Sequence, residues 1–526
     1  MILGDASPAS PAAAAAPTHR ASAVTIDAIF RRLVKRRPDA LALVDADNRE
    51  SFTAGEPRRL TYAEADRTVA AIAGRLRSMG LPTDAIVGVQ LPNIAENILT
   101  ILGILRAGMI VAPLPLLWRQ ADAVAALGRI GAKALITCGR VGAFNHCQFA
   151  MAVAADVFSI RYVCGFGNDL PDGVVPFDEL FNAPRLEPAP LLERGGHDNA
   201  AKHVAAVTFD VVDGGGVPAA RNHAELLAGG LAVVLEGRLA EDTNIVSAIA
   251  PTSFAGICLT LFPWLLCGGT LVLHHPFDAG VLIRQRRQYG CGTLVLPAPV
   301  AIRLADTSAF AVENPTCVIA AWHSPEQIAS APLWREPGSS LVDVAIFGEV
   351  ALIPARRDIS GKPPRLATGA IVVPQGGPDG SVVAELMRTD AGTVALRGPM
   401  VPHHPFPPGI EDSGLPYFKI GPKGVVDSGY TCRGDTLRNA IVVTGPPVGI
   451  VSVGGYRFLL RNLQDAVRRV DGAATLAALP DPVTGRRLIG NATNRSAMQA
   501  MLNAAGVNPL VVAAFADRSG QDVSAA

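Results

Sequence analysis

The sequence predicts an α/β protein with a large N-terminal domain of two βαβ-type sheets plus a β-rich subdomain, and a small α+β C-terminal domain. Two observations lead to this prediction. Apolar runs without polar alternation, such as 86–91 and 293–296, alternate with segments of helical spacing, as in parallel sheets covered on both faces. Between about 365 and 445, short strands alternate instead with glycine and proline turns, which indicates a smaller all-β layer.

The elements of the large domain follow from periodicity and from helix-end signals. Thr61 and Glu64 have the spacing of a capping box, which predicts a helix that runs from there to Gly80. Pro38 ends the first helix. Helices are expected at 26–37, 61–80, 93–108, 121–130 and 281–289, and strands at 41–44, 86–91, 109–112, 133–137, 245–250, 270–274, 293–296, 316–320, 341–347, 382–388, 393–397 and 440–443.

Composition sets the domain boundaries. Residues 1–24 are rich in alanine and proline and lack a basic start before an apolar run, so we expect a disordered tail and not a signal peptide. The large domain is placed at 25–445, the small domain at 446–516 and a polar tail at 517–526. Within the small domain we expect helices at 459–470 and 496–505, strands at 475–479 and 487–490 around a hairpin turn, and a last strand at 510–515.

Charge and cysteine content exclude several classes of function. The chain of 526 residues has 46 basic and 46 acidic side chains, so no overall charge draws it to nucleic acid. The eight cysteines are scattered without a CxxC or CxxH pair, which predicts reduced thiols, a cytoplasmic location and no structural zinc site. Arginine, glycine and prolines interrupt the most apolar run, 98–118, so no membrane span is expected.

A glycine-rich stretch provides the first candidate site. Gly214, Gly215 and Gly216 follow an apolar strand, 204–209, and precede a segment of helical spacing that begins near Leu226. A strand, a glycine loop and a helix in this order present backbone N–H groups to a phosphate. A flexible turn is the alternative.

Several segments, taken in order, resemble the adenylate-forming superfamily, which includes AMP-forming acyl-CoA synthetases, luciferases and the adenylation domains of peptide synthetases. The resemblance extends from Thr25 to Ala516. It implies a large domain that binds ATP and a carboxylate, and a small domain that rotates against it. The segments that carry it are LTYAEADRTVAAIAGRL, QLPNIAENILTILGILRAGMIVAPLPLLW, TLFPWLLCGGTLVLHHPFD, YGCGTLVLPAPVAIRL, GTVALRGPMVP, GYTCRGD, VTGPPVGIVSVGGYRF and PDPVTGRRL.

The resemblance also implies a reaction and its ligands. A carboxylic or fatty acid would attack the α-phosphorus of ATP, pyrophosphate would leave, and a thiol, usually CoA, would accept the acyl group. ATP or AMP, Mg²⁺ and CoA are therefore the expected cofactors, because backbone donors, the metal and a cation offset the charge that develops. The oligomeric state stays open, with a homodimer as one alternative.

The resemblance assigns nucleotide-binding roles to four further positions. Phe347 and Gly348 match an aromatic residue and a glycine near the adenine. Asp435 would accept hydrogen bonds from both ribose hydroxyls. Arg433 would contact phosphate, or it forms a salt bridge on the surface.

Two more positions carry an assignment with an open alternative. Phe254 would line the acyl pocket, or it is an ordinary core phenylalanine. Glu349 lies two positions from the carboxylate that holds Mg²⁺ in the family, which makes it a candidate for the metal and for catalysis; a solvated surface role is the alternative.

The sequence departs from the family pattern where chemistry is expected. Ala219 stands in place of the phosphate-loop lysine, and no lysine follows Lys423. Asp213 places a negative charge in the glycine loop, which Mg²⁺ or Arg221 would have to offset. The chain is therefore interpreted either as a slow acyl-CoA synthetase-like ligase or as a non-catalytic relative that binds nucleotide or acyl-CoA as a sensor or assembly partner. A protein that shares only the fold is the third alternative.

Overall fold

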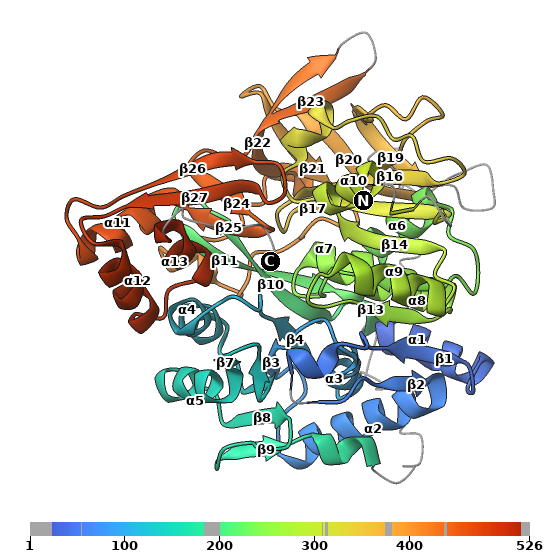
Figure 1. The fold of residues 1–526 in the computed structure, drawn as a ribbon, viewed down its shortest axis with the longest axis vertical. Coiled ribbons are helices and arrows are strands. Elements are labelled where there is room, and N and C mark those ends of the chain that lie inside the picture. The colour runs from blue at the N-terminus through green and yellow to red at the C-terminus, as the bar shows by residue number, and fades with distance from the viewer. Residues whose placement is uncertain are drawn as a thin grey trace, which may run out of the picture.

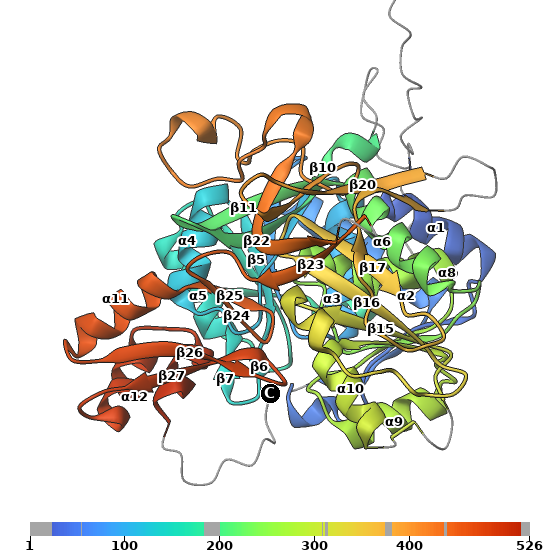
Figure 2. The ribbon, with the colours of Figure 1, turned by 90° about the horizontal axis from the view of Figure 1, so that it is seen from above.

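The computed structural model describes residues 24–53, 55–182, 200–307, 309–310, 314–373, 381–435 and 439–516. Two α/β sheets, a third antiparallel sheet and a C-terminal group of elements make up the molecule (Figure 1). This arrangement confirms the predicted fold class. The C-terminal elements, shown in red, lie beside α4, α5 and the ribbon of β10 and β11 in both views (Figures 1 and 2).

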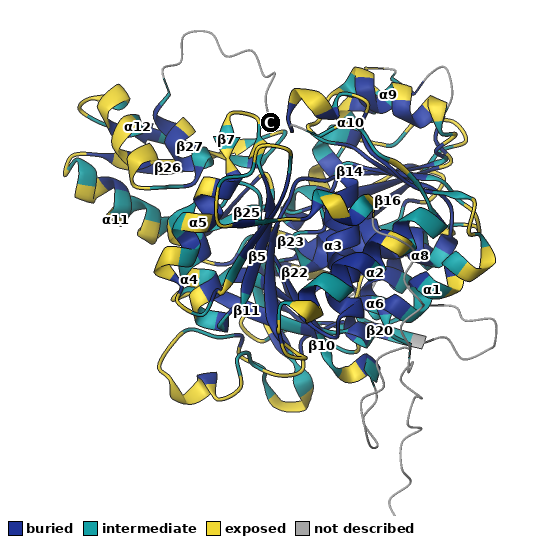
Figure 3. Ribbon diagram, turned by 90° about the horizontal axis from the view of Figure 1, so that it is seen from below, coloured by how far each residue is buried: buried dark blue, intermediate teal, exposed yellow. Residues whose placement is uncertain are grey.

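The first sheet has seven strands, all parallel except the outermost pair, β10 and β11. Helix α3 is buried at every position, and Figure 3 shows it between the two large sheets. In spatial order the strands are β11 (Gly215–Asn222), β10 (Val204–Val212), β4 (Ile110–Pro113), β3 (Ile86–Gln90), β5 (Ala134–Cys138), β8 (Tyr162–Phe166) and β9 (Val174–Pro176). The helices of this part are α2 (Tyr62–Ser78), α3 (Ala95–Arg106), α4 (Gln120–Ile130) and α5 (His146–Asp156).

The second sheet has eight strands with a parallel centre and one antiparallel strand at each edge. In spatial order these are β17 (Ala351–Arg356), β16 (Ser340–Phe347), β15 (Cys317–Trp322), β14 (Thr293–Pro297), β12 (Ile245–Ser247), β13 (Leu271–Leu273), β1 (Leu41–Val44) and β2 (Arg59–Thr61). The accompanying helices are α1 (Ile26–Arg36), α6 (His223–Gly237), α7 (Phe254–Gly256), α8 (Phe262–Cys267), α9 (Ala279–Gln288) and α10 (Ala298–Asp306).

A third, antiparallel sheet and a C-terminal unit complete the chain. The C-terminal unit has a hydrophobic core of its own, which includes Val467, Leu476 and Phe515. The third sheet is built from β18 (Leu366–Ala367), β23 (Ala440–Gly445), β22 (Val426–Asp435), β21 (Thr393–Arg397), β20 (Ser381–Arg388) and β19 (Gly369–Val373). The C-terminal unit contains β24 (Ile450–Val453), β25 (Tyr456–Leu459), α11 (Leu460–Val470), β26 (Thr475–Asp481), β27 (Gly485–Asn491), α12 (Arg495–Ala504) and α13 (Pro509–Val512). A small ribbon, β6 (Arg140–Val141) with β7 (Phe144–Asn145), precedes α5.

A local signal explains where α2 begins. The Thr61 hydroxyl accepts a hydrogen bond from Glu64 N at 3.2 Å, and the Glu64 carboxylate accepts one from Thr61 N at 2.8 Å. The predicted capping box of α2 is therefore confirmed. Tyr62, the next residue, stacks on Trp264 of α8 with ring centroids 5.8 Å apart, which joins α2 to the second sheet.

Within the described ranges, no helix combines the length and apolar character needed to cross a membrane.

The predicted last strand, 510–515, is wrong. The segment forms α13 followed by a short 3-10 turn, Ala513–Phe515. Asn508 caps the helix by accepting a hydrogen bond from Leu510 N at 3.0 Å, and Pro509 occupies the first helical position, where its missing N–H costs nothing. A short apolar run does not distinguish a strand from a buried helix by periodicity, and these two residues decide the outcome.

Phe515 is fully buried against Gly490 of β27. We expect Phe515→Ala to lower the unfolding free energy of the C-terminal unit by about 3–5 kcal/mol, because the substitution leaves a cavity. Hydrogen exchange of the β26–β27 amides should become correspondingly faster. Met501→Ala, on the exposed face of α12, is the control and should change exchange little; equal rates in both variants would contradict the expectation.

Candidate functional site

The carboxyl ends of the parallel strands of both large sheets meet under the hairpin formed by β24 and β25. Tyr456 of this hairpin accepts a hydrogen bond from the backbone N of Leu117, which follows β4, at 3.1 Å. Gly455 lies against His323, which follows β15; a Cβ on the glycine would be 3.3 Å from the imidazole ring. Ligands of open α/β sheets bind outside the carboxyl ends of the strands. The junction between these strand ends and the hairpin, called the crevice below, is therefore the candidate site.

Asp210, at the carboxyl end of β10, is the central side chain of the crevice. Its carboxylate is 2% exposed and pairs with the Arg457 guanidinium of β25. Oδ1 also accepts a hydrogen bond from Val211 N at 2.6 Å, and Oδ2 accepts one from Glu349 N at 2.7 Å. Gly348 has a φ of +57°, and a Cβ there would collide with both Arg457 and Asp210. Only glycine permits this close approach.

Arg457 keeps its charge although it is buried. Burial lowers the pKa of the Arg457 guanidinium, but attraction to Asp210 and the hydrogen bond between the two groups outweigh this effect, so the pKa is raised above its ordinary value. The guanidinium carbon lies 5.8 Å from the centre of the Tyr430 ring. The crevice therefore holds a permanent cation opposite a carboxylate.

Glu349 points into the protein and not toward solvent. Its Oε2 accepts hydrogen bonds from the Thr208 hydroxyl at 2.5 Å and from Phe254 N at 2.9 Å. Burial raises the pKa of this carboxyl group to about 7, with a further contribution from the neighbouring Asp210 charge. The predicted alternative of a solvated surface residue is wrong, because the residue is only 5% exposed.

Arg221 and Phe254 form the floor behind Glu349. The Arg221 guanidinium carbon lies 3.8 Å from the centre of the Phe254 ring. Its N–H groups donate hydrogen bonds to the carbonyl oxygens of Glu349 and of Met400, the latter at 2.9 Å. Both side chains are fully buried. Arg221 therefore braces the backbone of the crevice, and Phe254 occupies a core position in this arrangement.

The carboxylates of the crevice do not fit Mg²⁺ in this arrangement. Asp210 is neutralised by Arg457, and the Glu349 oxygen that is hydrogen-bonded faces Thr208 and an amide donor. Within the described parts of the chain, no group of three or more histidine, cysteine, aspartate or glutamate side chains is placed to hold a metal ion.

The glycine loop differs from the predicted strand–loop–helix unit. Gly214 lies in the turn of an antiparallel hairpin, and Gly215 and Gly216 already pair with β10 as part of β11. Eight residues of β11 separate the turn from α6, so the loop does not open a helix. Arg129 of α4 donates a hydrogen bond to Gly216 O at 2.7 Å. An Asp-Gly pair between apolar runs is a hairpin signal, and Asp213 with Gly214 was that signal.

The structure divides the other predicted nucleotide residues into two groups. Phe347 and Gly348 lie in the crevice, where the buried Phe347 ring meets Tyr430 edge-on with centroids 5.4 Å apart. Arg433 and Asp435 lie farther along β22 than Tyr430. The Asp435 carboxylate pairs with Arg365.

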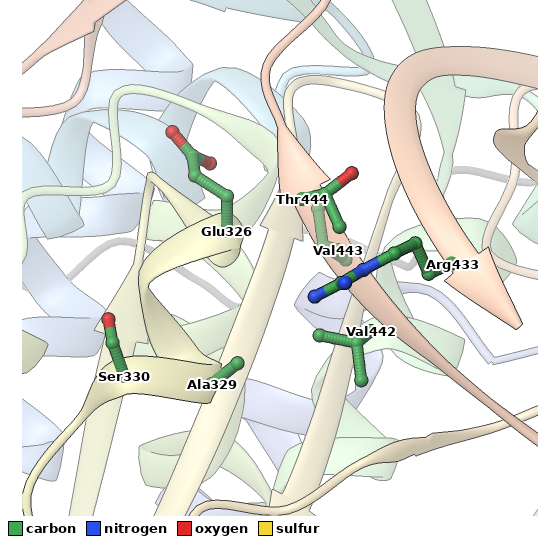
Figure 4. Close-up of a pocket in the computed structure, with 7 residues that line it drawn as sticks. All are labelled: Glu326, Ala329, Ser330, Arg433, Val442, Val443 and Thr444. Atoms are coloured by element: carbon green, nitrogen blue, oxygen red, sulfur yellow. The ribbon is translucent and has the colours of Figure 1, made fainter. Parts of the chain in front are cut away.

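Arg433 belongs to a cavity of about 450 Å³ between β22–β23 and the segment after β15. Figure 4 shows its guanidinium reaching across Val442 and Val443, with Glu326 on the opposite wall. Burial raises the pKa of Glu326, while Arg457 acts on the same group in the opposite direction. The cavity and the crevice share elements, because Glu326 follows His323 by three residues and Arg433 follows Tyr430 by three residues on β22. Its lining residues are Glu326, Ala329, Ser330, Arg433, Val442, Val443 and Thr444.

Sequence reasoning missed Asp210 and Arg457, which dominate the crevice. Asp210 is a lone carboxylate in the otherwise apolar strand β10. A charge in a buried strand requires a partner, so this position carried a usable signal. Its partner is 247 residues away, and no local pattern distinguishes Arg457 from the other arginines.

Part of the chain matches a known family. Residues 30–172 match the family model described as AMP-binding enzyme. Over 165 residues the chain is 31% identical to long-chain fatty acid transport protein 1 of Homo sapiens, covering 31% of this chain and 23% of that protein. Over 85 residues it is 40% identical to the beauvericin nonribosomal cyclodepsipeptide synthetase of Gibberella fujikuroi, covering 16% of this chain and 2% of that protein.

The fold matches more completely than the sequence. The amide bond synthetase of Marinactinospora thermotolerans has a TM-score of 0.68 and 17% identity over 92% of this chain and 94% of that one. At this identity the likeness establishes the fold. The matches to the two curated relatives span less than a quarter of the length of either protein. The family match bears out the resemblance for residues 30–172, and the solved structure bears out the fold.

The pKa of Glu349 makes stability depend on pH. The folded chain raises the pKa of this group from 4.5 to about 7, so the group binds its proton more tightly when folded. Its contribution favours folding fully below pH 4.5 and is lost as the pH rises through about 7. We expect the unfolding free energy of the native chain, relative to Glu349→Gln, to fall by up to about 3 kcal/mol between acidic and mildly alkaline pH.

Urea unfolding at a series of pH values measures this difference. Glu241→Gln, at a carboxylate that is 81% exposed, is the matched control and should unfold with the same pH dependence as the native chain. A Glu349→Gln variant that keeps the native pH dependence would show that the buried carboxyl group does not titrate in this range.

Proposed function

We propose that this chain, which carries the AMP-binding family match on the fold of adenylate-forming proteins, activates a carboxylic or fatty acid with ATP. The acid would displace pyrophosphate from ATP to form an acyl-adenylate, and the CoA thiol would then take the acyl group with release of AMP. One observation carries the proposal. The carboxyl ends of two parallel sheets converge under the β24–β25 hairpin, and a cavity of about 450 Å³ is lined by the same strand, β22, that carries Tyr430.

The cavity suits the nucleoside part of the nucleotide. Its volume lies within the range of small-molecule sites. Val442 and Val443 supply an apolar wall for the base, and Glu326 and Thr444 supply acceptors for ribose or adenine donors. Arg433 lies at the same cavity and supplies a cation for phosphate. Asp435 would join this site when its pairing with Arg365 is exchanged for a ribose.

As it stands in the structure, the crevice is poorly suited to bind the phosphates of ATP and the carboxylate of the acid. Asp210 places a negative charge where an anion would arrive, which is unfavourable. Loss of one donor at a site of this kind costs roughly 10²–10³ in rate. The chain also lacks lysine after Lys423 and has Ala219 in the glycine hairpin. Slow turnover is therefore part of the proposal.

A second candidate function is binding without turnover, as a nucleotide or acyl-CoA sensor or as an assembly partner. The Asp210–Arg457 pair favours it, because the two side chains occupy the centre of the crevice. Calorimetric titration with ATP, AMP and acyl-CoA separates the two candidates. Binding without chemistry supports the second, and efficient turnover excludes it.

We also propose a reducing, cytoplasmic environment and the domain boundaries at 25–445 and 446–516. All eight cysteines are buried and unpaired. Burial raises the pKa of thiols such as Cys164 to about 12, so these cysteines stay protonated and unreactive. The separate core of the C-terminal unit supports the second boundary.

Pyrophosphate release with ATP and a panel of fatty and aromatic acids tests the ligase directly. We expect acid-dependent release above the no-acid background, and slower than lysine-containing ligases achieve because several donors are missing. Absence of release with every acid, while AMP still binds, would leave only the second candidate.

Arg433→Ala tests the placement of the nucleotide. Loss of a hydrogen bond to a charged group costs about 1.5–3 kcal/mol, so we expect the affinity for AMP to fall roughly tenfold to a hundredfold by calorimetry. Arg468→Ala, on the exposed face of α11, removes the same charge elsewhere and should leave the affinity unchanged. Unchanged AMP binding in Arg433→Ala would move the nucleotide away from this cavity.

A further inference from the structure

The Asp210 carboxylate lies where three hydrogen-bond donors from different segments converge. Val211 N and Glu349 N donate to its two oxygens at 2.6 and 2.7 Å, and Arg457 donates from the C-terminal hairpin. The donors belong to β10, to the turn after β16 and to β25. Backbone amides together with a guanidinium are the groups that bind oxyanions in proteins.

The amides of Val211 and Glu349 and the Arg457 guanidinium, called the cradle below, have more N–H groups than the Asp210 carboxylate accepts hydrogen bonds from. The Nε atom of Arg457 is buried and has no hydrogen-bond partner in the described part of the chain. A buried N–H group without an acceptor is costly and rare. An oxyanion with a further oxygen could satisfy it. Gly348 lets the Arg457 guanidinium and the Asp210 carboxylate lie directly against its backbone, because a Cβ there would collide with both groups. An anion that takes the position of the Asp210 carboxylate meets the same donors.

We propose that the backbone amides of Val211 and Glu349 form, together with the Arg457 guanidinium, an oxyanion-binding site that the chain fills with its own Asp210. A carboxylate or phosphoryl group of a ligand takes the place of the Asp210 side chain. This inference rests on the proposed function only for the expectation that such a ligand enters the crevice.

The Asp210 carboxylate then competes with a ligand anion for the same three hydrogen-bond donors. An incoming anion has to displace a carboxylate that is already paired with Arg457, and the displaced charge stays close to it. The native chain should therefore bind small oxyanions weakly. The same pairing holds the β24–β25 hairpin against β10, so displacement of Asp210 also loosens the contact between the C-terminal unit and the first sheet.

Anion rescue of Asp210→Ala tests this inference. The variant leaves Arg457 buried without a partner, so it should be destabilised and then restabilised by an anion that binds the vacated cradle. We expect formate, phosphate or pyrophosphate to raise the melting temperature of the variant by roughly 3 °C or more at saturation, relative to chloride at equal ionic strength. The native chain should shift by less than about 1 °C.

Two further variants assign the effect to the cradle. Asp210→Ala combined with Arg457→Gln should lose the anion-dependent rise, because the guanidinium is gone. Asp213→Ala removes a carboxylate from the same hairpin whose side chain is 85% exposed and pairs with Arg461. This matched control should respond to anions as the native chain does.

Several outcomes of this experiment would contradict the proposed oxyanion site. An equal shift in the native chain and in Asp210→Ala, or a shift that persists without Arg457, overturns the proposal. Asp210→Ser is the second variant if Asp210→Ala does not fold; failure of both to fold even in phosphate also contradicts it, since the donors then accept no ligand.

Rescue by formate alone assigns the site to carboxylates, and rescue by phosphate or pyrophosphate assigns it to phosphoryl groups. No ATP or turnover enters the measurement. Its failure is therefore distinguishable from failure of the ligase proposal.

Discussion

A buried ion pair between Asp210 and Arg457 determines how the crevice of this protein is closed. Burying two charges costs several kcal/mol for each ion unless the geometry is good and the remaining valences are hydrogen-bonded. Here Val211 N and Glu349 N supply those hydrogen bonds. Removing either partner of such a pair typically costs about 3–5 kcal/mol, so the pair fixes the C-terminal hairpin on the first sheet.

One further acidic group, Glu349, and one further basic group, Arg221, lie next to this pair. Glu349 lies next to Asp210 and is kept partly protonated near neutral pH by burial and by that neighbour. The positive charge of Arg221 lies near the Glu349 and Asp210 carboxylates, and the guanidinium donates hydrogen bonds to backbone carbonyl oxygens. The low dielectric that makes each of these charges expensive also makes their interaction with a ligand strong. The crevice therefore holds several buried charges in close contact.

The fold brings this polar crevice to a place where α/β proteins bind ligands. The strand ends of the two sheets face one another, and the C-terminal hairpin covers both. The cavity with Arg433 and Glu326 is lined by the same strand, β22, that carries Tyr430. If the proposed nucleoside site and the proposed oxyanion site are both correct, they lie next to each other, as activation of a carboxylic acid by a nucleotide requires. In the present structure the Asp210 side chain of the chain itself occupies the proposed oxyanion site.

The sequence by itself determined most helices and strands of the large domain, the capping box of Thr61 and Glu64 and the parallel sheets, because these depend on local periodicity and on helix-end chemistry. It left 138–200 largely unassigned, where α5 and β8 occur. The direction of the Glu349 side chain, the hairpin form of the glycine segment and the pairing of Asp210 with Arg457 were decided only by the tertiary structure. Each depends on contacts between distant segments, and the free energy of a buried charge is set by whichever partner the fold brings to it.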